Sequence, residues 1–148
     1  FDISHIENMD LIVIMGNLLD NAIEAVHLTH KKDYRYSSLS DGEKQRTMIA
    51  KALAQDTPII FLDEPTSHLD LPNTIDIMQL LQSLARKTKK AILLSTHELE
   101  LTLQVADKIW MMTSGKLKTG LPEDLILNGD LQKTFGNFCF LLLFLVFL

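Results

Sequence analysis

The chain has 148 residues, 47% of them hydrophobic and 22% charged, which fits one small globular domain or part of a larger one. Its formal net charge of −5 at pH 7 argues against a nucleic-acid-binding protein, because such proteins usually present a basic face. The single cysteine, Cys139, excludes an internal disulfide and favours a reducing compartment.

The first predicted element is an amphipathic helix over residues 11–26. Its apolar residues recur at steps of three and four along the chain: Leu11, Ile14, Met15, Leu18, Leu19, Ala22, Ile23 and Val26. Residues 16–25 are similar to the N-box helix of sensor histidine kinases, in which asparagines matching Asn17 and Asn21 help to hold the Mg²⁺ of bound ATP. The glycine-rich boxes that complete that kinase site are missing from the sequence. We therefore expect residues 1–27 to be an N-terminal helical segment, and a chimeric chain joined near residues 25–30 is an alternative.

The second predicted helix begins at Ser40 and covers residues 43–55. Ser40 and Glu43 are three residues apart and fit a capping box, in which each side chain accepts a hydrogen bond from the other residue's N–H. Gly42 lets the backbone come close to a ligand, and the free N–H groups of a helix start favour an anion such as phosphate. An ordinary capped surface helix would contain the same residues, so both interpretations stay open at this point.

A short apolar run over residues 59–62 predicts a strand that is buried on both faces of a parallel sheet. Asp63 and Glu64 follow it directly. A carboxylate at a strand end can hold Mg²⁺ through water, and a neighbouring carboxylate can orient or deprotonate an attacking water. The alternative is a pair of solvated side chains without a function.

The remaining elements continue the α/β pattern. Asp70 is a predicted N-cap, with Pro72 in the first turn of a helix that ends near residue 87. Residues 91–94 predict a second buried strand, and His97 follows it. If the two strands are parallel, His97 lies at the same edge of the sheet as the carboxylate pair. The sequence further predicts a helix over residues 98–105, a hairpin of residues 108–112 and 116–119 turned at Ser114 and Gly115, and a helix beginning at Pro122.

Four of these stretches resemble the motifs of ATP-binding cassette (ABC) ATPases, in the same order. Residues 39–43 are similar to the signature motif, residues 59–64 to the Walker B strand with its catalytic glutamate, residues 67–70 to the D-loop and residues 95–98 to the switch-histidine loop. Residues 28–137 are thereby identified as the C-terminal half of such an ATPase domain. The D-loop and residues 106–110 are most similar to the ATP-binding subunits of iron-siderophore, haem and cobalamin importers.

The resemblance implies a role for each matching residue. The signature would contact the γ-phosphate of ATP held by a partner subunit, one carboxylate would hold Mg²⁺ through water, and the next would be the general base. The cofactor-binding residues would be Ser40, Asp41, Gly42, Glu43 and Asp70, the metal ligand Asp63, and the catalytic residues Glu64 and His97.

One motif of the family is missing. No Gly-x-x-x-x-Gly-Lys-Ser/Thr occurs in the sequence, so there is no P-loop, and neither the adenine-stacking aromatic nor the glutamine loop of the family is present. We therefore expect an α/β fold with an incomplete P-loop NTPase-like parallel sheet flanked by helices, in a fragment that hydrolyses no ATP alone.

For the complete protein, the resemblance implies a homodimer of ATP-binding subunits on the cytoplasmic face of the inner (plasma) membrane. It would use ATP and Mg²⁺ to power import of an iron complex, haem or a cobalamin-like substrate through transmembrane permease subunits. Nucleic acid would not be among its partners. A non-catalytic remnant and a histidine-kinase-like module are the alternatives. Structural-maintenance ATPases share a similar signature but require long coiled-coil heptads, which the sequence lacks.

Residues 138–148 are almost purely apolar, yet too few for a membrane-spanning helix, which needs about 20 such residues. We interpret them as a frameshifted or truncated tail whose removal improves solubility without lowering thermal stability. A buried helix or strand is the alternative.

Overall fold

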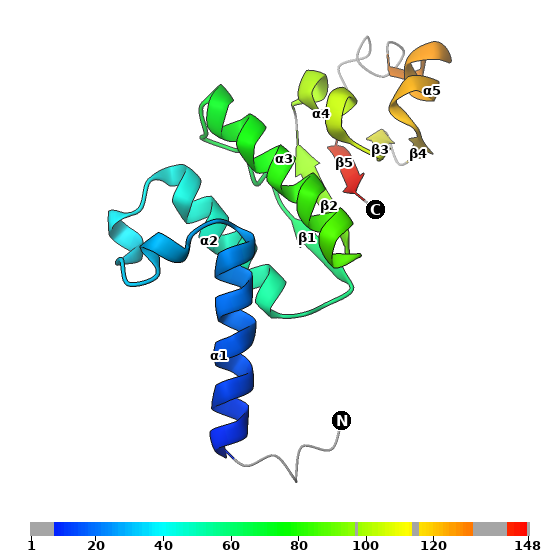
Figure 1. Ribbon diagram of the computed structural model, residues 1–148. Helices are drawn as coiled ribbons and strands as arrows, with labels where there is room; N and C mark the ends of the chain where they lie inside the picture. The colour runs from blue at the N-terminus through cyan, green and yellow to red at the C-terminus, as the bar shows by residue number, and fades with distance from the viewer. Residues whose placement is uncertain (1–7, 97, 114–115, 132–141, 148) are drawn as a thin grey trace. The chain divides into compact units, whose positions relative to one another are not determined.

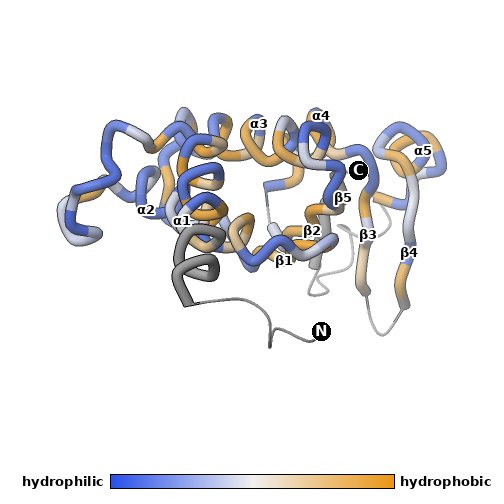
Figure 2. Tube along the Cα trace, turned by 60° about the horizontal axis from the view of Figure 1, so that its bottom comes forward, coloured by the Kyte–Doolittle hydropathy of each residue, from blue (hydrophilic) through white to orange (hydrophobic). Residues whose placement is uncertain are grey.

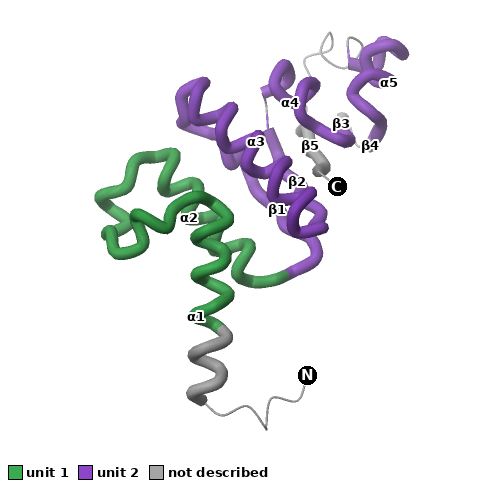
Figure 3. Tube along the Cα trace, in the orientation of Figure 1, with its two compact units in different colours: residues 1–56 green, residues 57–148 purple. Residues whose placement is uncertain are grey.

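The computed structural model describes residues 8–96, 98–113, 116–131 and 142–147, and it divides the chain into two compact units, residues 1–56 and 57–148 (Figure 3). His97, Ser114, Gly115, residues 132–141 with Cys139, and Leu148 lie outside the described residues. None of the described helices combines the length and the apolar character needed to cross a membrane.

The first unit is a pair of helices joined by two short 3₁₀ turns (Figure 1). Helix α1 (Asn8–Ala25) packs against α2 (Asp41–Ala54), and η1 (Thr29–Lys31) and η2 (Tyr36–Ser38) lie in the connection. The predicted helices are confirmed, with ends that differ by one to three residues. The apolar faces meet in a small core of Ala22, Val26, Leu28, Leu39, Ile49, Ala50 and Leu53.

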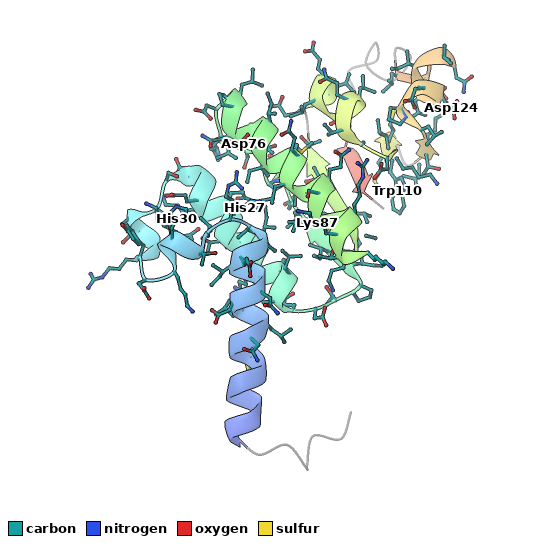
Figure 4. The ribbon with its side chains drawn as sticks, viewed as in Figure 1. His27, His30, Asp76, Lys87, Trp110 and Asp124 are labelled. Carbon is teal, nitrogen blue, oxygen red and sulfur yellow. The ribbon has the colours of Figure 1, made fainter. Side chains whose placement is uncertain are left out.

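Helix α1 ends in a left-handed turn at His27, which Figure 4 labels. The His27 N–H donates to the Glu24 carbonyl at 2.9 Å, and the Leu28 N–H donates to the Ile23 carbonyl at 3.0 Å. This pair of bonds is the Schellman motif, in which the residue at the position of His27 is usually glycine. His27 has a φ of 60°, so an L side chain occupies a backbone conformation that favours glycine.

The second unit is built on a five-stranded sheet with the strand order β1-β2-β5-β3-β4. Strand β1 (Ile59–Leu62) pairs with β2 (Ala91–Thr96) in parallel, and helix α3 (Leu71–Thr88) connects them. Strands β3 (Lys108–Thr113) and β4 (Lys116–Gly120) form the predicted antiparallel hairpin. The α/β class is confirmed, and the parallel arrangement is that of β1 and β2, where the candidate site residues lie.

Helix α3 lies along one face of the sheet (Figure 2), where it contacts β2 and β5. Its buried face carries Ile77, Met78, Leu81 and Leu84. Helices α4 (Leu99–Val105) and α5 (Pro122–Leu127) contribute to a second cluster around β3, in which Ile109, Met111, Leu125 and Leu131 are buried.

The prediction that β1 is buried on both faces is wrong. Ile60 is only 5% exposed, whereas Ile59 is 49% and Phe61 69% exposed. Side chains alternate between the two faces of a strand, so one face of β1 is covered and the other is bare. A run of apolar residues indicates a strand, but its burial depends on whether a second layer of structure lies over it.

The apolar tail contributes a strand, β5 (Leu142–Phe147), to the interior of the sheet. This strand is antiparallel to β2 on one side and to β3 on the other, and Leu145 lies opposite both Leu94 and Ile109. The structure therefore agrees with the alternative interpretation, in which the tail forms a strand of the sheet. It does not agree with a tail that contributes nothing to the fold.

Candidate functional site

The candidate site of the second unit lies where β1 and β2 end. Parallel strands bring their carboxyl ends to the same edge of a sheet, and the register places Leu62 opposite Leu94. Asp63 and Glu64 therefore follow β1 beside Ser95 and Thr96 of β2. Both carboxylate residues are exposed, whereas Ser95 is only 3% exposed.

The hydroxyl group of Ser95 connects the two carboxylate residues. It donates a hydrogen bond of 2.6 Å to Oδ1 of Asp63, and it accepts one of 2.8 Å from the backbone N–H of Glu64. A buried hydroxyl that uses both its donor and an acceptor position restricts the groups on either side of it. The orientation of the Asp63 carboxylate and the path of the chain at Glu64 are thus set by one residue of the neighbouring strand.

Sequence reasoning did not single out Ser95 as a site residue. The available signal was a hydroxyl residue at the end of an otherwise apolar strand, since residues 91–94 are all apolar. A buried polar side chain needs a hydrogen-bond partner, and here that partner lies 32 positions away in the chain.

The turn after Glu64 has an unusual backbone. Glu64 has a φ of 42° and His68 a φ of 66°, both in the left-handed region. The Ser67 N–H donates to the Glu64 carbonyl at 3.0 Å, and Pro65 and Thr66 are buried beneath the turn. Left-handed backbone at a residue other than glycine costs roughly 1–2 kcal/mol, so the packing of this turn holds Glu64 in place against that cost.

Asp70 is the N-cap of α3, as predicted. Its Oδ1 accepts hydrogen bonds from the Asn73 backbone N–H at 3.1 Å and from the Asn73 side-chain amide at 2.7 Å. Pro72 lies in the first turn of the helix. Within the described residues, these bonds account for the position of Asp70 at the start of α3.

Thr96 is the last residue of β2, and its Oγ1 accepts a hydrogen bond of 3.1 Å from the Glu98 N–H. The Glu98 carbonyl in turn accepts a hydrogen bond of 2.6 Å from the hydroxyl of Thr102, a residue of α4. His97, which comes between Thr96 and Glu98 in the sequence, lies outside the described residues.

In the first unit, the predicted capping box at Ser40 is confirmed. The Glu43 N–H donates to Ser40 Oγ at 3.3 Å, and the Ser40 N–H donates to Glu43 Oε2 at 2.9 Å. The bond from the Ser40 backbone lowers the pKa of Glu43, with smaller contributions from the Ser40 side chain and from Lys31, whose Nζ lies 3.6 Å from Glu43 Oε1. Both side chains of the box are therefore engaged in starting α2.

Two further signature residues lie in the first turn of α2. Gly42 is buried, and Asp41 accepts a 2.9 Å bond from Lys44, which raises the pKa of that lysine. The signature residues thus belong to the first unit, and the carboxylate pair with Ser95 belongs to the second.

The described residues contain no cluster of three or more His, Cys, Asp or Glu side chains that could hold a metal ion by themselves. A metal at Asp63 would need further ligands from elsewhere. A single carboxylate of this kind suits Mg²⁺, which usually keeps several waters and binds one or two carboxylates together with substrate phosphates.

Comparison with known proteins places these features in one family. A family model described as "ABC transporter" matches residues 4–67, which include the whole of α1, the capping box and the carboxylate pair. The methionine import ATP-binding protein MetN of Haemophilus ducreyi is 38% identical over 115 residues, 77% of this chain and 33% of that protein. The ferric enterobactin transport ATP-binding protein FepC of Escherichia coli is 32% identical over 122 residues, 82% of this chain and 45% of that protein.

A solved structure of an ABC transporter described as of the metal-chelate type, in an inward-facing conformation, superposes with a TM-score of 0.75 at 28% identity. The match covers 88% of this chain and 50% of that one. The chain thus spans between a third and a half of the length of these relatives.

Proposed function

Because the chain belongs to the ABC transporter family, as part of its ATP-binding domain, we propose that it carries the ATP-hydrolysing residues of a transporter's ATP-binding subunit. The observation that carries this proposal is the double hydrogen bond of Ser95 to Asp63 and to the N–H of Glu64. It holds two adjacent, exposed carboxylates at the edge of the sheet where α/β folds bind their ligands.

The two carboxylates take different roles. Asp63 accepts the Ser95 hydrogen bond on Oδ1, and its carboxylate would hold, through water, the Mg²⁺ that accompanies ATP. Bound Mg²⁺ neutralises charge on the phosphates. Glu64, exposed and fixed by its left-handed backbone, orients the attacking water and accepts its proton. Ser95 is a positioning residue for both.

The start of α2 takes the second role in ATP binding. A capped helix N-terminus with a glycine in its first turn favours phosphate, through backbone N–H groups and the helix dipole. In the proposed assembly, Ser40, Asp41, Gly42 and Glu43 face ATP held by a second ATP-binding subunit, Asp70 acts across the same dimer, and His97 contacts the γ-phosphate.

The substrate and the partners follow from the same resemblance. We propose a homodimeric ATP-binding subunit on the cytoplasmic face of the plasma membrane, bound to transmembrane permease subunits. Iron complexes, haem and cobalamin-like molecules are the proposed cargo, in keeping with the names of FepC and of the metal-chelate transporter. The name of MetN gives methionine as its cargo, so the proposed cargo class depends on the resemblance of residues 67–70 and 106–110.

The experiment that tests the proposal restores the missing phosphate site. Phosphoryl transfer depends on positioning and charge stabilisation of the phosphates, which a P-loop supplies. The chain alone is therefore expected to show no ATP turnover, and fusion of a P-loop segment from FepC to its N-terminus is expected to create it. Glu64→Gln in the fusion should abolish turnover, whereas Glu100→Gln, an exposed acid of α4, should leave it unchanged.

Two results would contradict the proposal. Turnover in the fusion that survives Glu64→Gln would remove the general-base role. A fusion that folds, as judged by circular dichroism, but binds no ATP in calorimetry would favour a remnant without nucleotide binding.

A further inference from the structure

The first unit contains a cavity of about 320 Å³ that the residues discussed above as ATP-binding do not line. It lies between α1, the connecting segment and α2. Its volume is at the lower end of the range of small-ligand pockets in proteins, which is roughly 300–1,000 Å³.

The walls of this cavity are apolar. Leu28 is 6%, Leu39 8% and Ala50 2% exposed, and the other uncharged residues of the lining are Leu19, Ile23, Ala54, Tyr34, Tyr36 and Thr47. A ligand that fills the cavity must therefore present an apolar body, because a polar group buried there without a partner would cost free energy.

The mouth of the cavity is cationic. Its lining includes Lys31, Lys32 and Lys51 and no acidic residue. Lys32 is paired with Asp20 at 2.7 Å, and Lys31 lies 3.6 Å from Glu43 and 4.4 Å from the centre of the Tyr34 ring. Neither acid belongs to the lining, so all the charged side chains that line the cavity are positive, and Lys31 and Lys32 each pair with an acid outside it.

We propose that this cavity binds a small amphipathic anion, a carboxylate or sulfonate on an apolar body. The apolar part fills the space between α1 and α2, and the anionic group meets the lysines at the mouth. Because Lys31 also pairs with Glu43 of the capping box, an anion that engages Lys31 alters the charge at the start of α2. Occupancy of the cavity is thereby linked to the N-terminus of α2.

The proposal is tested by titrating the full chain with 8-anilino-1-naphthalenesulfonate, followed by fluorescence. The uncharged N-phenyl-1-naphthylamine, which has the same apolar body, is the matched probe. We expect one saturable site for the sulfonate. Lys51→Glu should weaken sulfonate binding at least tenfold, whereas Lys87→Glu, an exposed lysine of α3 in the other unit (Figure 4), should leave it unchanged.

A second pair of variants tests the apolar wall independently of charge. Ala54→Leu places a larger side chain in the wall and should weaken both probes at least fivefold, whereas Ala52→Leu on the same helix, outside the lining, should not. Thermal melts establish that each variant is folded.

Backbone amide NMR locates the site. The sulfonate should shift amides within residues 19–54, including Ser40 and Glu43 at the start of α2. Equal sulfonate affinity in Lys51→Glu and in the parent would overturn the proposal, as would shifts concentrated in residues 57–131.

Discussion

The hydroxyl of Ser95, on β2, donates a hydrogen bond of 2.6 Å to Asp63 at the end of β1. The same oxygen accepts a bond from the Glu64 N–H, so one buried side chain fixes two consecutive residues that directly follow another strand. The geometry of the candidate site thus depends on the parallel pairing of β1 with β2.

Ser95→Ala is expected to destabilise the chain by about 1–3 kcal/mol, because it removes two hydrogen bonds, one of them to a charged carboxylate. Urea denaturation followed by circular dichroism measures this change. Ser83→Ala, at a half-buried serine of α3, is the matched control and should stay within about 0.5 kcal/mol of the parent. Equal stability of Ser95→Ala and the parent would show that water replaces the hydroxyl.

His27→Gly is expected to stabilise the first unit by roughly 0.5–1 kcal/mol. Glycine adopts the left-handed conformation of His27 without steric cost, and this gain exceeds the entropy that it adds to the unfolded chain. His30→Gly is the control, since His30 lies in η1 without a positive φ, and it should be neutral or destabilising. Thermal melts distinguish the two, and a lower melting temperature for His27→Gly would contradict the strain argument.

The charge of Glu43 is expected to make stability depend on pH in the acid range. Its pKa is lowered from the ordinary 4.5, chiefly by the Ser40 N–H. A carboxylate with a lowered folded pKa stabilises the fold above its unfolded pKa, and this contribution is lost as the pH falls through the folded value. Glu43→Gln keeps an acceptor but not the charge, so it should be less stable than the parent at pH 6, with the difference shrinking below about pH 4.5.

The control for this pH dependence is Lys31→Met. Lys31 is a minor cause of the lowered pKa of Glu43, so most of the stability difference between the parent and Glu43→Gln should persist when both carry Lys31→Met. A difference that does not change between pH 6 and pH 3 would show that charge is not what stabilises the cap.

Leu145→Pro is expected to lower the melting temperature of the second unit sharply. Leu145 lies in the middle of β5, opposite Leu94 on one side and Ile109 on the other, and proline removes a donor from the interior of a sheet. Leu145→Val keeps the backbone donor and should change stability much less. Removal of residues 138–148 should lower the melting temperature as well, whereas an unchanged melt would favour the interpretation of a tail that the fold does not need.

Several local features could be read from the sequence because their partners are three or four residues apart. The capping box of Ser40 and Glu43 and the N-cap Asp70 with Asn73 are of this kind. Side chains so close in the chain meet whenever the helix forms, whatever surrounds it. The carboxylate pair was likewise predicted, since Asp63 and Glu64 directly follow an apolar strand.

Other features were decided by tertiary structure alone. The partner of Ser95 is 32 positions away, β5 enters the sheet between two strands that precede it, and Phe61 is exposed although its neighbours in sequence are apolar. Each depends on which strands pair and which faces are covered. Hydrophobic pattern indicates only that a segment can be buried, because the free energy of burial comes from the surface that covers it, and that surface is supplied by residues far away in the chain.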